Sequence, residues 1–148
     1  ILYRDLKPQN IGLDDKGLVK MFDFGLAKEL KPEFQVGIDQ YTGRKDTGSR
    51  RYMAPEVYNG DAYGLPADVF SFSVVFWQLM SLRIPYKGLA MEAHVNAVFV
   101  KKRRPALKMK WPRQLKKIIV AGWSHNPSHR PKIIEYLHTI EDHLKNHR

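Results

Sequence analysis

The stretch from Val69 to Met80 is the most apolar part of the sequence, and it constrains the fold more than any other segment. Pro66 suits the first turn of a helix, and Asp68 favours the same end because a carboxylate interacts well with the positive pole of the helix dipole. Apolar side chains cover every face of a helix drawn from Pro66 through roughly Leu82. Such a helix is buried all round, so the sequence predicts one central helix with other elements packed about it.

This apolar stretch does not predict a membrane span, because Ser71, Ser73 and Gln78 interrupt it and a bilayer requires about 20 apolar residues. The absence of cysteine excludes disulfides and thiolate metal sites. The N-terminal residues show no signal-peptide pattern. With 148 residues the chain has the size of one ordinary domain, and we expect a soluble, intracellular, cytoplasmic protein.

Four shorter helical patterns accompany the central one. They predict a short helix that ends near Tyr58 before Asn59-Gly60, a helix over residues 90–100, and a helix from Pro112 through Trp123. The last pattern predicts a final helix, because its apolar residues fall at helical spacing: Ile133, Ile134, Leu137, Ile140 and Leu144.

One β-hairpin is expected near the N-terminus. Residues 11–13 and 19–22 are short apolar runs on either side of the polar turn Asp14-Asp15-Lys16-Gly17. Asn10 precedes the first run and Asp23 follows the second, so a hairpin would bring two oxygen ligands together. Such ligands suit a hard cation such as Mg²⁺. The predicted fold class is mainly α with a small β-hairpin.

Residues 26–53 lose any regular period, and glycines and a proline break the pattern. Because elements with clear periods bracket this segment, we predict a long functional loop and not a disordered linker.

The formal net charge of +10 favours acidic partners. Much of it lies in one region: Lys101, Lys102, Arg103, Arg104, Lys108, Lys110, Arg113, Lys116 and Lys117. A solvated face explains this region most simply, and a docking surface for acidic segments is the alternative. Trp111 is the only aromatic residue among these cations, so the sequence argues against single-stranded nucleic acid as a partner.

The first ten residues carry the strongest chemical signal. The stretch Tyr3-Arg4-Asp5-Leu6-Lys7-Pro8-Gln9-Asn10, followed by Asp23-Phe24-Gly25, supplies carboxylates, an amide and a lysine within a short span. Phosphoryl transfer needs a residue to accept the proton of the nucleophile, ligands for a metal and a cation for the phosphates. Asp5, then Asn10 with Asp23, and Lys7 fit these three tasks.

With Ala54-Pro55-Glu56 further along, these motifs resemble the eukaryotic protein kinase family, over essentially the whole chain. The residues in and around these motifs look most like those of the tyrosine-kinase-like branch of the serine/threonine kinases. The resemblance implies a catalytic loop at 3–10, a metal-binding loop at 23–25, an activation loop at 23–56 and a helical subdomain at 57–148. It also implies ATP and Mg²⁺ as cofactors and a protein serine or threonine hydroxyl as the acceptor.

The resemblance gives each motif residue a role. Asp5 would be the catalytic base, and Lys7, which is typical of the serine/threonine class, would neutralise charge on the transferred group. Asn10 and Asp23 would hold the metal that bridges the ATP phosphates, while Phe24 would pack into the core. The simpler alternatives are a surface-loop aspartate at position 5 and a turn cap at position 23.

Three further residues are expected to be structural. In the family the glutamate of Ala-Pro-Glu pairs with an arginine between the last two helices, which here are Glu56 and Arg130. Asp68 matches the helix aspartate that anchors the catalytic-loop backbone; an ordinary first-turn dipole partner is the alternative.

Hydroxyl residues in the activation loop are candidates for regulation. Ser49 occupies the place of the residue that bonds the catalytic aspartate and lysine. Thr42 and Thr47 are the candidate phosphorylation sites, and Arg4 would hold the added charge.

The sequence departs from the family at Tyr3, where histidine is usual, at Ser73, where glycine is usual, and at Gly12. The family usually has a bulky residue under the adenine at the position of Gly12, and a glycine there would loosen nucleotide binding or widen the pocket.

The glycine-rich loop and the strand lysine of a kinase are not found in the chain, so we expect a C-terminal lobe without the N-terminal lobe, inactive by itself. Two hypotheses follow: a part of an active serine/threonine kinase, or a pseudokinase-like docking module.

Overall fold

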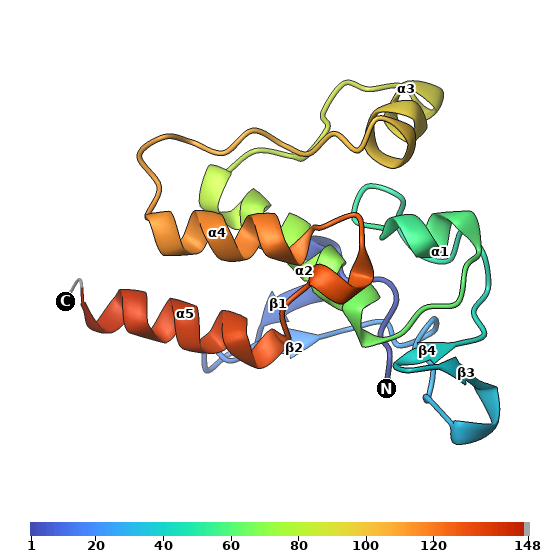
Figure 1. Cartoon of the computed structure of the whole chain (residues 1–148). Coiled ribbons are helices and arrows are strands. Elements are labelled where there is room, and N and C mark those ends of the chain that lie inside the picture. Colours follow the sequence, from blue (N-terminus) through green and yellow to red (C-terminus); the bar gives the residue numbers. More distant parts are fainter. Residues whose placement is uncertain (147–148) are drawn as a thin grey trace.

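The structure is a computed structural model that describes residues 1–146 (Figure 1). Helices dominate, and the strands form two separate two-stranded sheets. The α-helices are α1 (Pro55–Asn59), α2 (Leu65–Ser81), α3 (Met91–Val95), α4 (Arg113–Gly122) and α5 (Ile133–Lys145). The strands are β1 (Ile11–Leu13), β2 (Val19–Met21), β3 (Gln35–Gly37) and β4 (Gln40–Tyr41). The predicted class, mainly α with a small hairpin, is confirmed.

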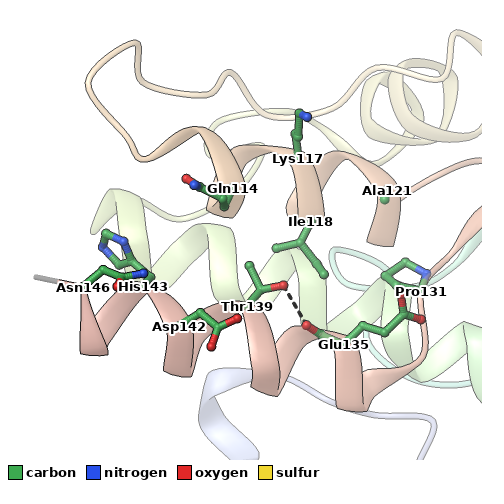
Figure 2. A pocket seen from close by; sticks show the side chains of 10 residues that line it. All are labelled: Gln114, Lys117, Ile118, Ala121, Pro131, Glu135, Thr139, Asp142, His143 and Asn146. Atoms are coloured by element: carbon green, nitrogen blue, oxygen red, sulfur yellow. Dashed lines mark hydrogen bonds between the residues drawn. The ribbon is translucent and has the colours of Figure 1, made fainter.

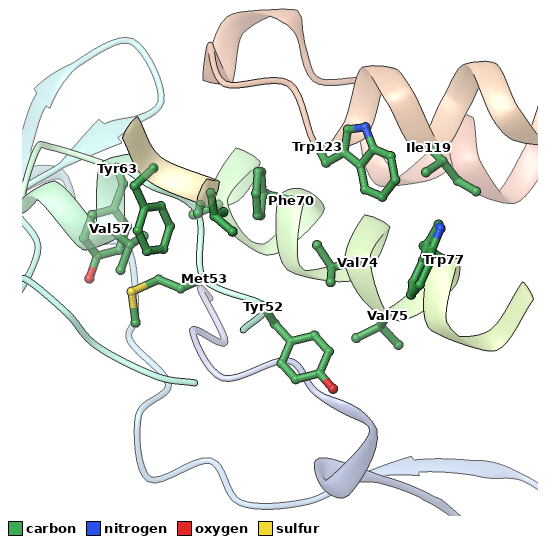
Figure 3. Packing of buried hydrophobic residues seen from close by; sticks show 14 of the residues in the cluster. Tyr52, Met53, Val57, Tyr63, Phe70, Val74, Val75, Trp77, Ile119 and Trp123 are labelled. Carbon is green, nitrogen blue, oxygen red and sulfur yellow. The ribbon is translucent and has the colours of Figure 1, made fainter. Parts of the chain in front are cut away.

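Helix α2 is the centre of the molecule. It packs against α4, and α4 packs against α5 (Figure 1). Phe70 and Val74 of α2 are fully buried, and they belong to one cluster with Ile119 of α4 and with Trp123, which follows α4 (Figure 3). Burying side chains of this size is the main stabilising contribution to such a core.

The prediction that α2 is buried on all sides is wrong for one face. Phe72 and Phe76 are only partly buried, and Leu79 is 61% exposed. These residues are spaced by four and three positions and therefore share one stripe of the helix. No element within residues 1–146 covers that stripe completely.

The apolar residues at helical spacing in the last helix are not the ones that the core buries. Ile133, Leu137 and Leu144 of α5 are each about half exposed, and the one buried residue of α5 is Tyr136. The periodicity identified the helix, but it did not identify the face that packs on α4.

Tyr136 joins three helices. Its hydroxyl lies 2.6 Å from the Ser73 hydroxyl of α2 and donates to the Ile118 carbonyl of α4 at 2.9 Å. Gly122 leaves room for this contact, since a Cβ there would lie 2.1 Å from Ser73 Oγ and 2.2 Å from Tyr136 Oη. Ser73, a departure from the family pattern, is therefore part of a buried polar contact.

The first hairpin pairs β1 and β2 antiparallel, with Ile11 opposite Met21 and Leu13 opposite Val19. Asp14 closes the turn by accepting hydrogen bonds from the N–H groups of Lys16 and Leu18. The predicted hairpin is confirmed, with its second strand one residue shorter than expected.

A second hairpin, β3 with β4, lies in the segment for which we predicted no regular structure. A short 3₁₀ turn, Pro32–Phe34, precedes it, and Tyr41 pairs with Tyr63 near the start of α2. Strands of three and two residues with polar and glycine positions give no clear period, so this hairpin was missed.

The other helices agree with the sequence apart from one irregularity. Helix α1 ends where Gly60 adopts a left-handed conformation (φ 85°). The helix predicted over 90–100 starts as α3 and widens into a π-helical turn at Asn96–Val100, where Phe99 stacks on Tyr58 of α1 at 4.1 Å. Within the described residues, no helix is both long and apolar enough to cross a membrane.

Candidate active site

The loop that carries Asp5 is anchored to α2 by Asp68. The two carboxylate oxygens of Asp68 accept hydrogen bonds from the backbone N–H groups of Tyr3 (2.6 Å) and Arg4 (2.9 Å). Arg4 has φ 71°, a strained conformation that these bonds help to hold. Burial raises the pKa of Asp68, while the two N–H donors oppose that rise. The structure thus places Asp68 where it fixes the loop backbone.

Asp5 lies at the centre of a group of donors. Lys7 Nζ donates to Asp5 Oδ2 at 2.7 Å, and the backbone N–H of Ser49 donates to Asp5 Oδ1 at 2.8 Å. Lys7 Nζ also donates to the Ser49 hydroxyl at 3.0 Å. Burial would raise the pKa of Asp5, but the hydrogen bonds from Lys7 and Ser49 outweigh it, so the pKa lies below its ordinary value. Asp5 is therefore an ionised carboxylate at neutral pH.

Asn10 completes the surroundings of Asp5. Its Nδ2 donates to the Asp5 carbonyl at 3.0 Å and to Asp5 Oδ2 at 3.2 Å, and the side chain is buried. The 3₁₀ turn Pro8–Asn10 brings Asn10 back towards Asp5. Because the amide nitrogen is engaged, the amide oxygen is the atom that Asn10 can offer to a cation.

Asp23 reaches the same region through the hairpin. The N–H of Phe22 donates to the Asn10 carbonyl at 2.9 Å, which places the end of β2 beside Asn10. Asp23 has φ 55° and accepts a hydrogen bond from Gly25 N–H, and its carboxylate is exposed. The geometry brings the two expected metal ligands to one end of the hairpin.

Tyr3 links the two loops, a role that the sequence did not reveal. Its hydroxyl donates to the Phe22 carbonyl, and its ring packs edge-on against Phe24 at 5.4 Å. Burial raises the pKa of Tyr3, and the negative charges of Asp5 and Asp23 raise it further. Both carboxylates therefore act on the same phenol. Spacing gives no signal for this contact, since it depends on how the hairpin folds back.

Phe24 does not pack into the core as the resemblance implied: it is 59% exposed, and its ring contact is with Tyr3. The Phe22 ring also changes the expectation for Gly12. A Cβ at Gly12 would lie 2.7 Å from Phe22 Cε2, so the aromatic ring occupies the space that the glycine leaves.

The segment that contains Ser49 lies directly on the catalytic loop. Gly48 has φ 99°, and a Cβ there would lie 2.2 Å from the Arg4 carbonyl oxygen. Only a residue without a side chain allows this approach. Gly48 is a second site residue that the sequence did not single out; its place between Thr47 and Ser49 was the available signal.

The two threonines named as phosphorylation candidates differ in accessibility. Thr42 is exposed, whereas Thr47 is buried and its hydroxyl donates to the Arg44 carbonyl at 2.9 Å. Arg4, expected to hold an added phosphate, donates through Nε to the Leu26 carbonyl and through Nη1 to the Tyr63 hydroxyl.

Glu56 and Arg130, 74 positions apart, form a buried two-point ion pair. Arg130 Nη1 and Nη2 donate to the two Glu56 carboxylate oxygens at 2.6 and 2.8 Å. Arg130 also donates to the carbonyls of Ser124 and Pro66, which satisfies more of its N–H groups. This pair ties α1 to the segment before α5.

An open cavity of about 420 Å³ lies between α4 and α5, and Asp5 is not among its lining residues. Side chains such as Lys117 and Glu135 line it (Figure 2). Among residues 1–146 there is no group of three or more His, Cys, Asp and Glu side chains that could hold a metal. A cation at the end of the hairpin would rely on Asn10, Asp23 and oxygens of its own ligand. That donor set fits Mg²⁺, which binds through one or two carboxylates and substrate phosphates.

Comparison with known proteins supports the same chemistry. Residues 1–140 match the family described as the protein kinase domain. The chain is 39% identical over 137 residues to the dual specificity protein kinase shkB of Dictyostelium discoideum, covering 91% of this chain and 20% of that protein. It is 33% identical over 141 residues to the probable serine/threonine-protein kinase drkC of the same organism, covering 95% of this chain and 18% of that protein.

A plant protein is similar to the chain as well. The serine/threonine-protein kinase STY46 of Arabidopsis thaliana is 31% identical over 142 residues, covering 96% of this chain and 24% of that protein. The chain thus spans about a fifth of the length of these relatives. Because the family match covers nearly all of the chain, the chain belongs to the protein kinase domain family.

Proposed function

We propose that the chain is the C-terminal catalytic lobe of a serine/threonine protein kinase that transfers the γ-phosphate of ATP to protein hydroxyls. One observation carries this proposal: the Asp5 carboxylate receives hydrogen bonds from Lys7, Ser49 and Asn10 within a single buried group. Lys7 and Asn10 lie in the same loop as Asp5, whereas Ser49 is 44 positions away, and a surface aspartate does not need such a set of donors.

Asp5 would accept the proton of the substrate hydroxyl. Its lowered pKa keeps it ionised at neutral pH, and its hydrogen bonds fix the direction in which it can accept. Lys7 lies between Asp5 and Ser49, where a cation can neutralise charge on the transferred group without displacing the base.

Asn10 and Asp23 would hold Mg²⁺, which supplies charge neutralisation on the ATP phosphates when it is bound. The Phe22–Asn10 and Tyr3–Phe22 hydrogen bonds keep the ends of the hairpin together. These hydrogen bonds lie beside Asn10 and Asp23, at the end of the hairpin opposite its turn.

The specificity for serine and threonine rests on Lys7 and its bond to Ser49. Thr42 is the accessible candidate for regulatory phosphorylation in the activation loop. We expect no turnover from the 148-residue chain alone, since the glycine-rich loop and strand lysine of the family are not part of it.

A catalytically inactive docking module is the second candidate. The Phe22 ring beside Gly12 favours it, because this arrangement differs from the bulky residue usual under the adenine and could weaken nucleotide binding.

The test is transfer of labelled phosphate from Mg-ATP to a generic basic protein, with the chain expressed together with its upstream coding segment. Asp5→Asn should remove most turnover, by about 10²-fold or more, while nucleotide binding stays near normal. Asp23→Asn should abolish transfer and raise the Mg²⁺ concentration that nucleotide binding requires. Lys110→Gln, an exposed lysine outside the site, is the control.

Unchanged turnover in Asp5→Asn would exclude that residue as the base. Absence of transfer by the unaltered protein, with circular dichroism showing a folded state, would favour the docking module.

A further inference from the structure

The segment beside the catalytic carboxylate carries an excess of positive charge. Residues 42–51 contain Arg44, Lys45, Arg50 and Arg51 against the single carboxylate of Asp46. The Ser49 N–H touches Asp5, so this segment lies at the edge of the candidate active site. A substrate hydroxyl at Asp5 would bring its neighbouring residues into this field.

Arg50 is the cation that the chain itself neutralises. Its guanidinium donates through Nε to Asp46 at 2.9 and 3.1 Å, and Nη1 contacts the Met91 sulfur at 2.9 Å. This contact holds Arg50 between the activation segment and α3. Asp46 is thus the ion-pair partner of Arg50, and the charge of Lys45 also acts on its carboxylate.

The remaining three cations form no ion pair in the described part of the chain. Within residues 1–146, the side chains of Arg44, Lys45 and Arg51 have neither a carboxylate partner nor a hydrogen-bond acceptor. Arg44 and Lys45 are exposed, whereas Arg51 is partly buried. The N–H groups of Arg51 therefore remain available as donors to a ligand.

His94 of α3 lies near Arg50 and Arg51. It is 7% exposed, and its Nε2 has no hydrogen-bond partner. Burial lowers the pKa of His94, and the positive charges of Arg51 and Arg50 lower it further. A buried imidazole and two guanidinium groups thus share one neighbourhood, in which Arg50 is paired with Asp46 and Arg51 with no carboxylate of the described residues.

Resting on the proposed function, we propose that Arg51, assisted by Arg44 and Lys45, selects protein substrates with Asp or Glu within about two residues of the acceptor hydroxyl. Arg51 follows Ser49 by two positions, and two extended residues span at most about 7 Å. A carboxylate beside the acceptor would supply the anion that Arg51 lacks. Complementary charge of this kind raises both affinity and specificity.

The experiment uses three peptides that share a central serine and differ only in the two residues on each side of it: Glu, Gln or Lys. Binding to the full 148-residue chain is measured by fluorescence anisotropy at low and high salt. Transfer is measured with the protein that carries its upstream coding segment.

At low salt the Glu peptide should bind about fivefold or more tightly than the Gln peptide, and the Lys peptide most weakly. Arg51→Gln should remove most of this difference, Arg51→Lys should keep it, and Arg51→Glu should favour the Lys peptide. High salt should reduce the preference of the unaltered chain.

Arg113→Gln is the matched control, since it removes one exposed arginine at the start of α4. Equal binding of the three peptides, or equal effects of Arg51→Gln and Arg113→Gln, would overturn the selectivity. The retained preference of Arg51→Lys shows that loss in Arg51→Gln does not reflect unfolding.

The two proposals fail differently. Transfer to all three peptides at one rate would leave the kinase proposal standing and overturn the selectivity. Arg51-dependent binding of the Glu peptide without transfer would support the selectivity and count against the kinase proposal.

Discussion

The Arg130 side chain is fully buried against Glu56, and its two terminal nitrogens donate to the two oxygens of that carboxylate. The pair joins α1 to the start of α5 and lies above the Phe70 ring, 5.1 Å from the Arg130 guanidinium. Because both charges are desolvated, each depends on the other.

Arg130→Ala should therefore destabilise the chain by about 3–5 kcal/mol, since it leaves the Glu56 carboxylate buried without its partner. The melting temperature should fall by on the order of 10 °C in a calorimetric scan. The double variant Glu56→Gln with Arg130→Met should recover part of the loss. A melting temperature equal to that of the unaltered chain would contradict the structural role.

Gly48→Ala should separate the segment around Ser49 from the loop that carries Asp5. The new Cβ would meet the Arg4 carbonyl oxygen at 2.2 Å, and φ 99° is unfavourable for alanine. We expect a loss of at least about 2 kcal/mol in the free energy of unfolding and faster proteolysis within residues 42–53.

Gly17→Ala is its control. Gly17 also has a positive φ, 76°, but a Cβ there meets nothing within 4 Å. Gly17→Ala should lower the free energy of unfolding by about 1–2 kcal/mol, because of the backbone conformation alone. Equal effects of the two substitutions would mean that the contact with Arg4 is not tight.

Ser49→Ala should reduce turnover without removing it. The variant loses the hydroxyl that accepts from Lys7, but its backbone N–H still donates to Asp5. In steady-state kinetics of the protein with its upstream segment, we expect a loss of roughly tenfold. Ser49→Thr keeps a hydroxyl and should stay close to the unaltered rate; an equally slow threonine variant would argue against the hydrogen bond.

The free energy of unfolding should decrease as the pH falls below 6.5, the ordinary pKa of histidine. Burial and the charges of Arg51 and Arg50 lower the pKa of His94 in the folded state. Between the two pKa values the unfolded chain binds a proton that the folded chain does not, so acid favours unfolding, by at most about 1.4 kcal/mol per pH unit for one histidine.

Urea titrations at several pH values should show this slope, and His94→Leu should flatten it. His125→Leu provides the comparison, because burial lowers the pKa of His125 as well. A slope that His94→Leu leaves unchanged would assign the effect to other groups.

Gly122→Ala should disturb the contact between α2, α4 and α5. Its Cβ would lie 2.1 Å from Ser73 Oγ and 2.2 Å from Tyr136 Oη, so one of these groups must move. Overpacking of this kind costs about 1–3 kcal/mol. Chemical denaturation measures it, and adding Tyr136→Phe should relieve part of the loss; no relief would place the strain elsewhere.

Local sequence patterns were sufficient to predict the main helices and the first hairpin. The 3.6-residue period and the helix-ending Asn59-Gly60 express preferences of neighbouring residues, which persist in any fold. The hairpin pattern likewise predicted that Asn10 and Asp23 lie at the same end of the hairpin, because a short polar turn leaves the chain little choice.

The burial of particular faces was decided by tertiary packing. The sequence showed an apolar stripe on the last helix, yet Tyr136 alone of α5 is buried, since Ser73 and Gly122 together form its site. Tyr3, Gly48 and the unpaired Arg51 also acquire their roles from segments far away in sequence. Periodicity reports which side chains share a face of one element, whereas only the assembled chain determines which neighbour, if any, meets that face.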